Sequence, residues 1–338
     1  MNINQPPPLT TDLVLIGGGH AHVHLLKMFG MPKYKSILTK HGIQVTLITK
    51  DVMTPYSGML PGYLAGYYTY DEIHLDLRKL CQFGGVRLIH TSCTGISYKD
   101  DDDNGKYIEC SDGRPNIRYD VVSVDVGCTP SSSGFEDAKA VTAVKPISSF
   151  ADRFQSILDR ISDEGKQVAE GASYVFVVVG GGAGGIEVCL SFDKRLKEIF
   201  AKKNRNAAFR LVLMTRGSSI LTGHNAMVQK KFQRILKERG VEVILNSNVV
   251  GVNDEKGVEN ELIYEIQNNS QPQKIKFDDC LWCTSANAAS WIKKNTPFRT
   301  DCSGFLLVND YLECVDHRGA FAAGDCASMT NYARPKGK

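Results

Sequence analysis

Short runs of apolar residues, many of them β-branched, alternate with segments of helical periodicity along most of this chain. Two of these runs end in glycine clusters: residues 12–16 run into Gly17-Gly18-Gly19, and residues 174–179 run into Gly180-Gly181-Gly182. Each cluster is followed by a helical pattern and then by another apolar strand, which predicts two βαβ units with parallel strands and right-handed crossovers. The expected helices are His20–Phe29 and Ile186–Lys203, and the strands that follow them are Ile43–Thr49 and Phe209–Thr215.

The remaining segments repeat one plan in both halves of the chain. Residues 87–126 alternate between strands and polar turns, which is typical of a β-meander inserted in an α/β domain. Other expected elements are a polar loop at Pro32–Gly42, helices at Phe150–Val168 and Ala226–Arg239, and strands at Val241–Leu245, Cys280–Thr284 and Ala320–Ala327. The pattern predicts an α/β fold with two Rossmann-like nucleotide-binding domains, three-layered sheets and inserted β-meanders. We expect boundaries near 145 and 295, so that residues 10–145 and 296–338 form one discontinuous domain and 146–295 form the other.

Composition narrows the class of protein. The chain has 338 residues, 42% hydrophobic and 23% charged, which is typical of a globular protein large enough for two domains. A net charge of +3 without a basic run argues against nucleic acid as a partner.

No apolar run approaches the roughly 20 residues of a membrane span. About a dozen residues precede the first strand, which leaves no room for a leader peptide. The ten scattered cysteines fit reduced thiols. We therefore expect a cytoplasmic protein, and peripheral membrane or organelle association stays open.

The second glycine cluster has the spacing of a dinucleotide turn. Gly180, Gly182 and Gly185 form G-x-G-x-x-G between a strand and a helix, where backbone amides can approach a pyrophosphate. The acid that would bind the ribose 2′-hydroxyl at the end of the next strand is missing, and Thr215-Arg216 stands there. Since a guanidinium can pair with a 2′-phosphate, this favours NADPH over NADH without deciding between them.

The first cluster is less regular. Gly17 and Gly19 fit the motif, but His22 occupies the position of the third glycine, which keeps helix and strand farther apart. The following strand ends at Thr49, and the acid Asp51 comes late. Alone, this turn is a weaker dinucleotide signal than the second.

His20, His22 and His24 also raise the alternative of a metal site, as in a metal-dependent hydrolase. On a helix, residues two apart point to different faces, so only His20 and His24 could share an ion. The three preceding glycines fit a phosphate turn better, and we expect these histidines at the start of a helix near the pyrophosphate.

Further segments resemble the flavin-dependent pyridine nucleotide-disulfide oxidoreductases, whose fold is that of glutathione reductase. Gly324-Asp325 resembles the element that binds the FAD ribityl chain through an aspartate, and residues 119–130 resemble a strand and its Ala-Thr-Gly junction, here Asp-Val-Gly at 125–127. Residues 279–286 resemble the parallel junction of the nicotinamide half, with Ser285 in place of glycine.

The chain is most similar to the type II NADH dehydrogenase-like oxidoreductases that are associated with selenophosphate synthetase, through Gly-Gly-Gly-His-Ala-His-Val at 17–23 and Thr-Pro-Tyr-Ser-Gly-Met-Leu-Pro-Gly at 54–62. The resemblance makes His22 and Thr49 features of the family. It also implies that residues 55–61 line the flavin and that Glu187 lies near the nicotinamide. The residues implied in FAD binding are Gly17, Gly18, Gly19, His20, His22, Thr49, Pro55, Ser57, Gly127, Gly324 and Asp325. Those implied in NAD(P)H binding are Gly180, Gly182, Gly185, Glu187, Thr215 and Arg216.

The resemblance implies an enzyme that passes a hydride from the nicotinamide of NAD(P)H to N5 of FAD. Cys280 and Cys283 lie three apart in a strand and point to opposite faces, which disfavours a catalytic disulfide. Electrons would then pass to a diffusible acceptor such as a quinone, oxygen or a small oxidant, and no residue is assigned as general acid or base. A homodimer stays open. The alternative is a weakly catalytic or non-catalytic redox sensor that resembles relatives of apoptosis-inducing factor.

The sequence ends 13 residues after Asp325, whereas the relatives that it resembles continue with a C-terminal interface segment. We therefore expect a flavin site that is less closed and exchanges FAD or reacts with oxygen readily.

Overall fold

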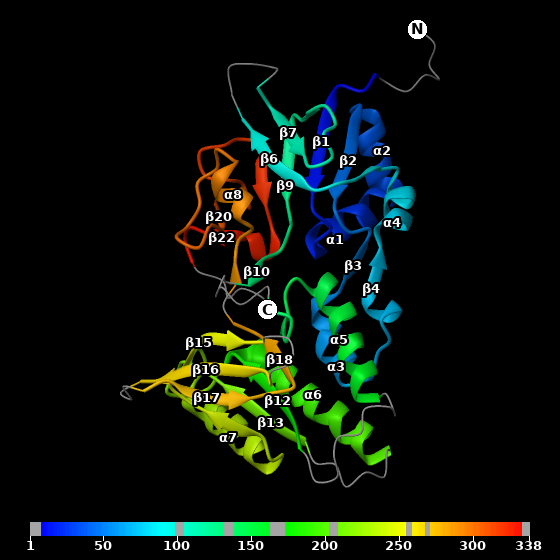
Figure 1. Ribbon diagram of the computed structural model, residues 1–338. Helices are drawn as coiled ribbons and strands as arrows, with labels where there is room; N and C mark the ends of the chain where they lie inside the picture. The colour runs from blue at the N-terminus through cyan, green and yellow to red at the C-terminus, as the bar shows by residue number, and fades with distance from the viewer. Residues whose placement is uncertain are drawn as a thin grey trace. The chain divides into compact units, whose positions relative to one another are not determined.

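The computed structural model describes residues 8–98, 105–130, 138–162, 173–202, 209–254, 259–267, 271–284 and 286–332. The chain divides into two compact units (Figure 1). The first unit comprises Met1–Tyr56, His74–Thr129 and Ala286–Gly337, and the second chiefly Ser57–Ile73 and Pro130–Ser285. The boundaries between the units thus lie at residues 129/130 and 285/286, whereas we expected them near 145 and 295. In addition, the short segment Ser57–Ile73 groups with the second unit. Ser285 of the expected junction lies outside the described residues.

A five-stranded parallel sheet forms the centre of the first unit. Its strand order is β21-β9-β1-β2-β5, so β1 lies between β9 and β2. Leu15 of β1 pairs in register with Leu47 of β2 on one side and with Ser123 of β9 on the other. The strands are β1 (Thr11–Ile16), β2 (Ile43–Thr49), β5 (Arg87–His90), β9 (Val121–Val124) and β21 (Ala320–Ala322).

Alternate residues of these strands bury opposite faces of the sheet. Leu15 and Leu47 pack against the helices α1 (His20–Phe29) and α4 (Leu77–Gly84). Val14 and Ile16 face the antiparallel sheet of β6 (Cys93–Ser97), β7 (Tyr107–Cys110) and β8 (Ile117–Arg118). This confirms the predicted three layers of the first unit. The predicted meander is confined to β6–β8, whereas both ends of the expected range 87–126 form the strands β5 and β9 of the parallel sheet.

One predicted element is wrong: Pro32–Lys40, expected within a polar loop, is the helix α2. Pro32 stands at its first position, where a missing N–H costs nothing. No residue of α2 is fully buried, and only Tyr34 and Leu38, four positions apart, are partly buried, so its apolar stripe is too narrow for hydrophobic periodicity to stand out among the polar residues.

The second unit repeats the parallel arrangement in the order β11-β18-β12-β13-β14. Val177 of β12 pairs with Val212 of β13 and with Cys280 of β18. The strands are β11 (Val141–Ala143), β12 (Tyr174–Val179), β13 (Phe209–Met214), β14 (Glu242–Ile244) and β18 (Asp279–Trp282).

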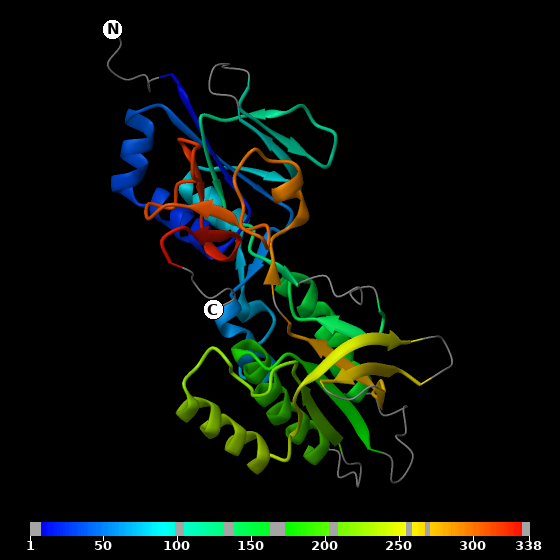
Figure 2. The ribbon, with the colours of Figure 1, turned by 90° about the vertical axis from the view of Figure 1, so that its left-hand side faces the viewer.

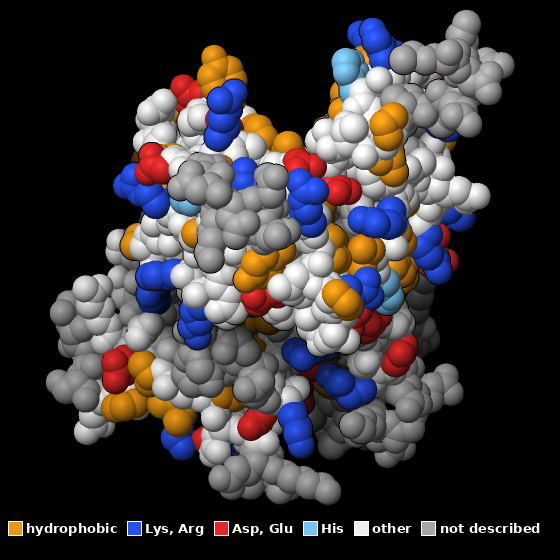
Figure 3. Space-filling model, turned by 90° about the horizontal axis from the view of Figure 1, so that it is seen from above, with side chains coloured by type: hydrophobic (Ala, Val, Ile, Leu, Met, Phe, Trp, Pro, Cys, Tyr) orange, Lys and Arg blue, Asp and Glu red, His pale blue; other side chains and the backbone are white. Residues whose placement is uncertain are grey.

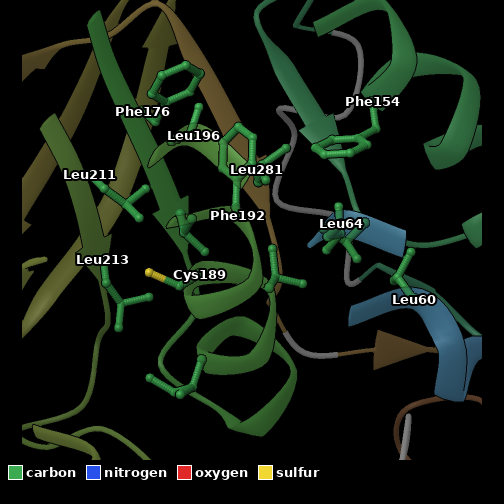
Figure 4. Close-up of a cluster of buried hydrophobic side chains, with 14 of the residues drawn as sticks. Leu60, Leu64, Phe154, Phe176, Cys189, Phe192, Leu196, Leu211, Leu213 and Leu281 are labelled. Atoms are coloured by element: carbon green, nitrogen blue, oxygen red, sulfur yellow. The ribbon is translucent and has the colours of Figure 1, made fainter. Parts of the chain in front are cut away.

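Both faces of this sheet are covered. Phe176 and Val178 join a cluster with residues of α3 (Leu60–Leu64), α5 (Ile147–Ser162), α6 (Ala183–Lys202) and α7 (Ala226–Glu238), part of which is drawn in Figure 4. Val177 and Val179 face the antiparallel sheet of β15 (Ser247–Asn253), β16 (Glu261–Ile266) and β17 (Gln273–Lys276), seen in yellow and orange in Figure 2. Of the predicted helix Phe150–Val168, the part after residue 162 lies outside the described residues.

The remaining elements are short. They are β3 (Met53–Pro55), η1 (Ser57–Met59), η2 (Asp71–Ile73), β4 (His74–Asp76), β10 (Thr129–Pro130), β19 (Ala286–Asn287), α8 (Ser290–Lys294), β20 (Leu306–Val308), η3 (Gly324–Cys326) and β22 (Ala327–Met329). None of the described helices is long and apolar enough to cross a membrane. On the face shown in Figure 3, Lys and Arg side chains are interspersed with Asp and Glu side chains.

The aromatic cluster of the second unit gives a test of the fold. Phe154 is fully buried, and its ring lies 5.8 Å from that of Tyr63 and 5.6 Å from that of Phe192, measured between centroids. Phe154→Ala should lower the free energy of unfolding by about 3–5 kcal/mol, because it removes this contact and leaves a cavity. Met227→Ala on α7, where the side chain is 81% exposed, is the control and should change it by less than about 0.5 kcal/mol. Equal urea midpoints for the two variants would contradict this packing.

Candidate functional site

Three parallel strands of the first unit end side by side. Ile16 at the end of β1 pairs with Val124 at the end of β9, and Val124 also pairs with Ala322 at the end of β21. Because parallel strands present their carboxyl ends at one edge, the segments that follow them meet there. These segments carry Gly17–Gly19, Gly127 and Gly324-Asp325, so the sheet brings together residues that are about 300 positions apart in the sequence.

Asp125, which the sequence analysis did not select, lies at the centre of this edge. Its backbone oxygen accepts a hydrogen bond from the Gly19 N–H (3.1 Å), and its carboxylate accepts from the Ala21 N–H (2.9 Å). A Cβ on Gly19 or Gly324 would overlap the carboxylate, and one on Gly17, whose φ is +93°, would overlap the Asp125 backbone oxygen. Asp125 thus requires glycine at positions 17 and 19 of the first turn. In the sequence, Asp125 could be noticed only as the first residue of the Asp-Val-Gly at 125–127, which replaces the Ala-Thr-Gly junction.

The Asp125 carboxyl group is held in an environment that favours its neutral form. The side chain is 3% exposed, and burial raises its pKa to about 6. The amide hydrogen bonds from α1 and the nearby His20 act in the opposite direction, whereas the charge of Asp325 raises the pKa further. A carboxyl group that titrates near neutrality therefore stands at the turn where we expect a pyrophosphate.

His22, at the position of the third glycine, is turned into the protein. Its side chain is fully buried, its Nδ1 lies 2.7 Å from the Gly17 backbone oxygen, and its Nε2 lies 2.9 Å from the Ser123 hydroxyl. A carbonyl oxygen can only accept, so Nδ1 carries the proton and Nε2 accepts from Ser123. Burial lowers the pKa of His22 to about 4. A neutral imidazole therefore joins β1, α1 and β9 beneath the turn.

His20 stands on the outer side of the same turn. Its ring centroid lies 4.3 Å from that of Tyr56, at an interplanar angle of 33°. Burial lowers the pKa of His20, and the Asp125 charge partly offsets this. As for the metal alternative, the described residues contain no group of three or more His, Cys, Asp or Glu side chains that could hold an ion.

The other residues implied in FAD binding lie around the ends of β2 and β21. The Thr49 hydroxyl donates to the Asp51 backbone oxygen (2.9 Å), which ties down the turn after β2. Pro55 ends β3, whereas Ser57 begins η1, which groups with the second unit. The Asp325 carboxylate lies 3.3 Å from the Cys128 thiol, which donates to it.

Gly127 and Gly324 both adopt left-handed backbone conformations, with φ of +69° and +68°. Space around the Cα of Gly127 is open, with no atom within 4 Å of an added Cβ. These two glycines allow the chain to turn sharply after β9 and β21 and leave room at the edge of the sheet.

The second turn is built differently. The Gly180 N–H donates to the Met214 backbone oxygen (2.8 Å), and the Leu221 N–H donates to the Gly181 backbone oxygen (2.7 Å). A Cβ on Gly180 or Gly185 would overlap backbone atoms, but one on Gly182 meets nothing within 4 Å. The turn therefore leaves free space at Gly182, directly before the start of α6.

Residues at the end of β13 lie beside this turn. The Thr215 side chain stands against Gly181, whose added Cβ would overlap it. Arg216 is exposed and forms no hydrogen bond or ion pair with the described residues. Glu187 is exposed in the first two turns of α6. An unpaired cation thus follows β13, at the position where a dinucleotide's adenosine ribose binds in this fold.

The two thiols near the second turn belong to different layers. Cys280 is in the cluster that faces β15–β17, and Cys283 packs against the helical cluster on the other face. Burial raises the pKa of both thiols. Their side chains therefore point to opposite faces of the sheet, as residues three apart in a strand do.

Comparison with known proteins places this geometry in context. A family model described as pyridine nucleotide-disulphide oxidoreductase matches residues 11–336. A probable NADH dehydrogenase of Dictyostelium discoideum is 22% identical over 96% of this chain and 69% of its own length. The structure of NDH2 from Plasmodium falciparum in complex with NADH superposes with a TM-score of 0.71, at 18% identity over 94% of this chain and 64% of that one.

A further similar structure is an engineered water-forming NADPH oxidase bound to NADPH, with a TM-score of 0.67 and 17% identity, covering 94% of this chain and 63% of that one. It derives from an NADH oxidase of Lactobacillus brevis. The chain thus spans slightly under two thirds of the length of these solved structures.

The opposed pKa values of His22 and Asp125 predict how stability depends on pH. The pKa of His22 is about 4 in the folded protein and 6.5 in the unfolded chain. Its contribution to stability is therefore fully present above pH 6.5 and is lost as pH falls towards 4. The pKa of Asp125 is about 6 in the folded protein and 3.8 in the unfolded chain. Its contribution to stability is therefore fully present below pH 3.8 and is lost as pH rises through 6. Between pH 4 and 6 the two effects of pH on the free energy of unfolding nearly cancel. The folded form then holds one proton on Asp125 and the unfolded form holds one on His22, so unfolding neither binds nor releases a proton.

Single variants should unmask each contribution in urea unfolding of the protein without added nucleotide. Asp125→Asn should lose up to roughly 3 kcal/mol more than the wild type as pH falls from 6.5 to 4, and His22→Asn should lose stability as pH rises over the same range. Asp76→Asn, which removes the exposed carboxylate cap of α4, should follow the wild type. Parallel profiles for all four proteins would disprove the assignment.

Proposed function

The chain belongs to the pyridine nucleotide-disulphide oxidoreductase family, and from this premise we propose that it oxidises NAD(P)H through bound FAD and reduces a diffusible acceptor. It is an NADH dehydrogenase-like oxidoreductase of α/β fold, whose cofactors are FAD and a nicotinamide dinucleotide. When bound, FAD supplies a ring that accepts a hydride and releases electrons singly or in pairs. The observation that carries the proposal is the presence, in each unit, of a parallel sheet whose glycine turn opens a helix.

The residues of the first unit fit FAD. In its turn, the N–H groups of Gly18 and His20 have no acceptor among the described residues and are available to a pyrophosphate. Asp325 is half-buried at the same edge and can accept hydrogen bonds from the hydroxyls of a ribityl chain. The open space at Gly127 gives the nucleotide room at the edge of the sheet.

The residues of the second unit fit a nicotinamide dinucleotide. Gly182 leaves space for a pyrophosphate to approach the backbone at the start of α6. Exposed Glu187, one turn into that helix, is available to the nicotinamide ribose or amide. The role of these residues is to bind and orient the donor.

We propose NADPH as the preferred donor. Arg216 supports this, since an unpaired guanidinium at the end of β13 can form bidentate hydrogen bonds to a 2′-phosphate. No acidic residue stands there to bind the 2′-hydroxyl of NADH. The engineered NADPH oxidase also supports a role of arginine in NADPH preference, because its substitutions replace an aspartate with alanine and the next alanine with arginine.

The acceptor that we propose is a small diffusible oxidant, with a quinone as the first class to test. The arrangement of the thiols supports this. Buried Cys280 and partly buried Cys283 lie on opposite faces of their sheet, and none of the ten cysteines forms a disulfide with a described residue. No pair of described thiols is placed to relay electrons to a disulfide substrate, which supports a small acceptor that FAD, when bound, would reduce directly.

Anaerobic titration of the FAD-loaded protein tests the function. NADPH should bleach the flavin absorbance stoichiometrically, and a short-chain quinone should restore it. Gly182→Val should lose this bleaching while dithionite still bleaches the flavin, because the added side chain fills the free space at the second turn without meeting the protein. FAD that is bound but never bleached by NADPH or NADH would instead identify a non-catalytic nucleotide-binding protein.

Donor preference has its own test. Arg216→Ala should lower kcat/KM for NADPH by about 10- to 100-fold and leave that for NADH nearly unchanged, since only a charge-assisted hydrogen bond to the 2′-phosphate is lost. Arg210→Ala is the matched control: it removes an arginine from the opposite end of β13, where it pairs with Glu242. An unchanged NADPH/NADH ratio in Arg216→Ala would refute this role.

A further inference from the structure

The first glycine turn already contains an anion-binding group of its own. The Oδ2 atom of Asp125 lies 2.9 Å from the Ala21 nitrogen and 3.4 Å from the His22 nitrogen, and both N–H groups donate to it. These amides belong to the first turn of α1, where a helix normally presents unpaired N–H groups to a phosphate. The Asp125 carboxyl group therefore already accepts two of the N–H groups that the start of α1 could donate to a phosphate.

The other amides of the turn are also used, with two exceptions. The Gly17 N–H donates to the Ile48 backbone oxygen (2.8 Å) and the Gly19 N–H to the Asp125 backbone oxygen (3.1 Å). Only the N–H groups of Gly18 and His20 lack an acceptor among the described residues of the turn. A pyrophosphate that binds here must use these two donors, and it then lies next to the Asp125 carboxyl group, which touches Gly19.

The groups that face Asp125 offer little compensation for a second anion. His22 is neutral because burial lowers its pKa to about 4, and the pKa of His20 is also lowered by burial. Asp325 of η3 adds a like charge, and the neighbouring Cys128 thiol donates to Asp325. An ionised Asp125 would therefore repel the phosphate at short range in a buried setting, where charges are weakly screened.

We propose that Asp125 is a proton-linked ligand of the flavin nucleotide, which takes up one proton from solvent when the pyrophosphate binds at Gly18 and His20. This rests on the proposed assignment of FAD to the first unit. The proton adds to a carboxylate oxygen of Asp125, and no bond within FAD changes. One oxygen continues to accept from the α1 amides, and the other, beside Gly324, gains an O–H donor that faces the nucleotide edge of the sheet.

The proposal explains why a carboxyl group can stand at a phosphate turn. Without nucleotide, the pKa of Asp125 is about 6, so the carboxyl group is mostly ionised at pH 7.5 and caps α1 as an anion. With nucleotide, the neutral acid removes the repulsion. The affinity for FAD should then fall as pH rises above 6, because the proton must be taken from a solution that contains fewer of them.

Isothermal titration calorimetry of the FAD-free full-length chain tests this. Binding of FAD, measured at pH 7.5 in two buffers of different ionisation enthalpy, should take up close to one proton, and the affinity should fall by up to about tenfold per unit between pH 7 and 8.5. Asp125→Asn should bind FAD without proton uptake and with an affinity that is nearly independent of pH, since the amide keeps an acceptor for α1.

Two further variants separate the explanations. Asp76→Asn, the carboxylate cap of α4 away from the turn, should retain the wild-type proton uptake. His20→Gln should also retain it, and loss of uptake in this variant alone would assign the proton to His20 and overturn the proposal. Wild-type binding of FAD without uptake between pH 7 and 8 overturns it as well, whether or not Asp125→Asn folds. A wild-type chain that binds no FAD at any pH would instead contradict the proposed function.

Discussion

The first unit depends on one steric and hydrogen-bonding constraint, the meeting of three strand ends around Asp125. Its backbone oxygen and carboxyl group occupy the space that side chains at Gly17, Gly19 and Gly324 would need. The parallel pairing of β1, β9 and β21 brings these residues to one edge, although they come from opposite ends of the chain. Beneath them, the neutral imidazole of His22 connects the helix to the neighbouring strand and replaces the close helix–strand contact that a third glycine usually allows.

The two glycine turns therefore differ in chemistry, although both open a helix after a parallel strand. The first contains an internal carboxyl group and leaves two amides to a ligand. In the second, Gly180 donates to the Met214 backbone oxygen, Gly181 accepts from the Leu221 N–H, and the turn is open at Gly182. We propose that a nucleotide binds at the first turn with a linked change of protonation, and that Arg216 beside the second turn attracts the additional phosphate of NADPH. The difference suits a resident flavin in one unit and an exchanging donor in the other.

Several features could be predicted because they depend on residues close together in the sequence. The period of two in β18 and the residue that follows it places Cys280 and Cys283 on opposite faces, and the glycine spacing marks both turns. The helix α2 escaped prediction because only Tyr34 and Leu38 are partly buried, which leaves a narrow apolar stripe in a mostly polar segment. Asp125 escaped because its importance comes from contacts with residues more than a hundred positions away, which no local pattern contains. His22 could be noticed as a departure from the motif, but its burial and its tautomer depend on Ser123 of another strand.

The class of fold, the two glycine turns and their neighbouring helices follow from the order of the residues, since strand and helix periodicity and glycine spacing are local properties. The absence of an acid after β13 and the presence of Arg216 are likewise visible in the sequence. Which residues share the edge of the first sheet, and which of its amides remain available, depends on how the strands pack. Burial and neighbouring charge set the protonation of Asp125 and His22, and these depend on the packing of three strands and a helix. What distinguishes the two turns chemically was therefore decided by contacts between residues that are distant in the sequence.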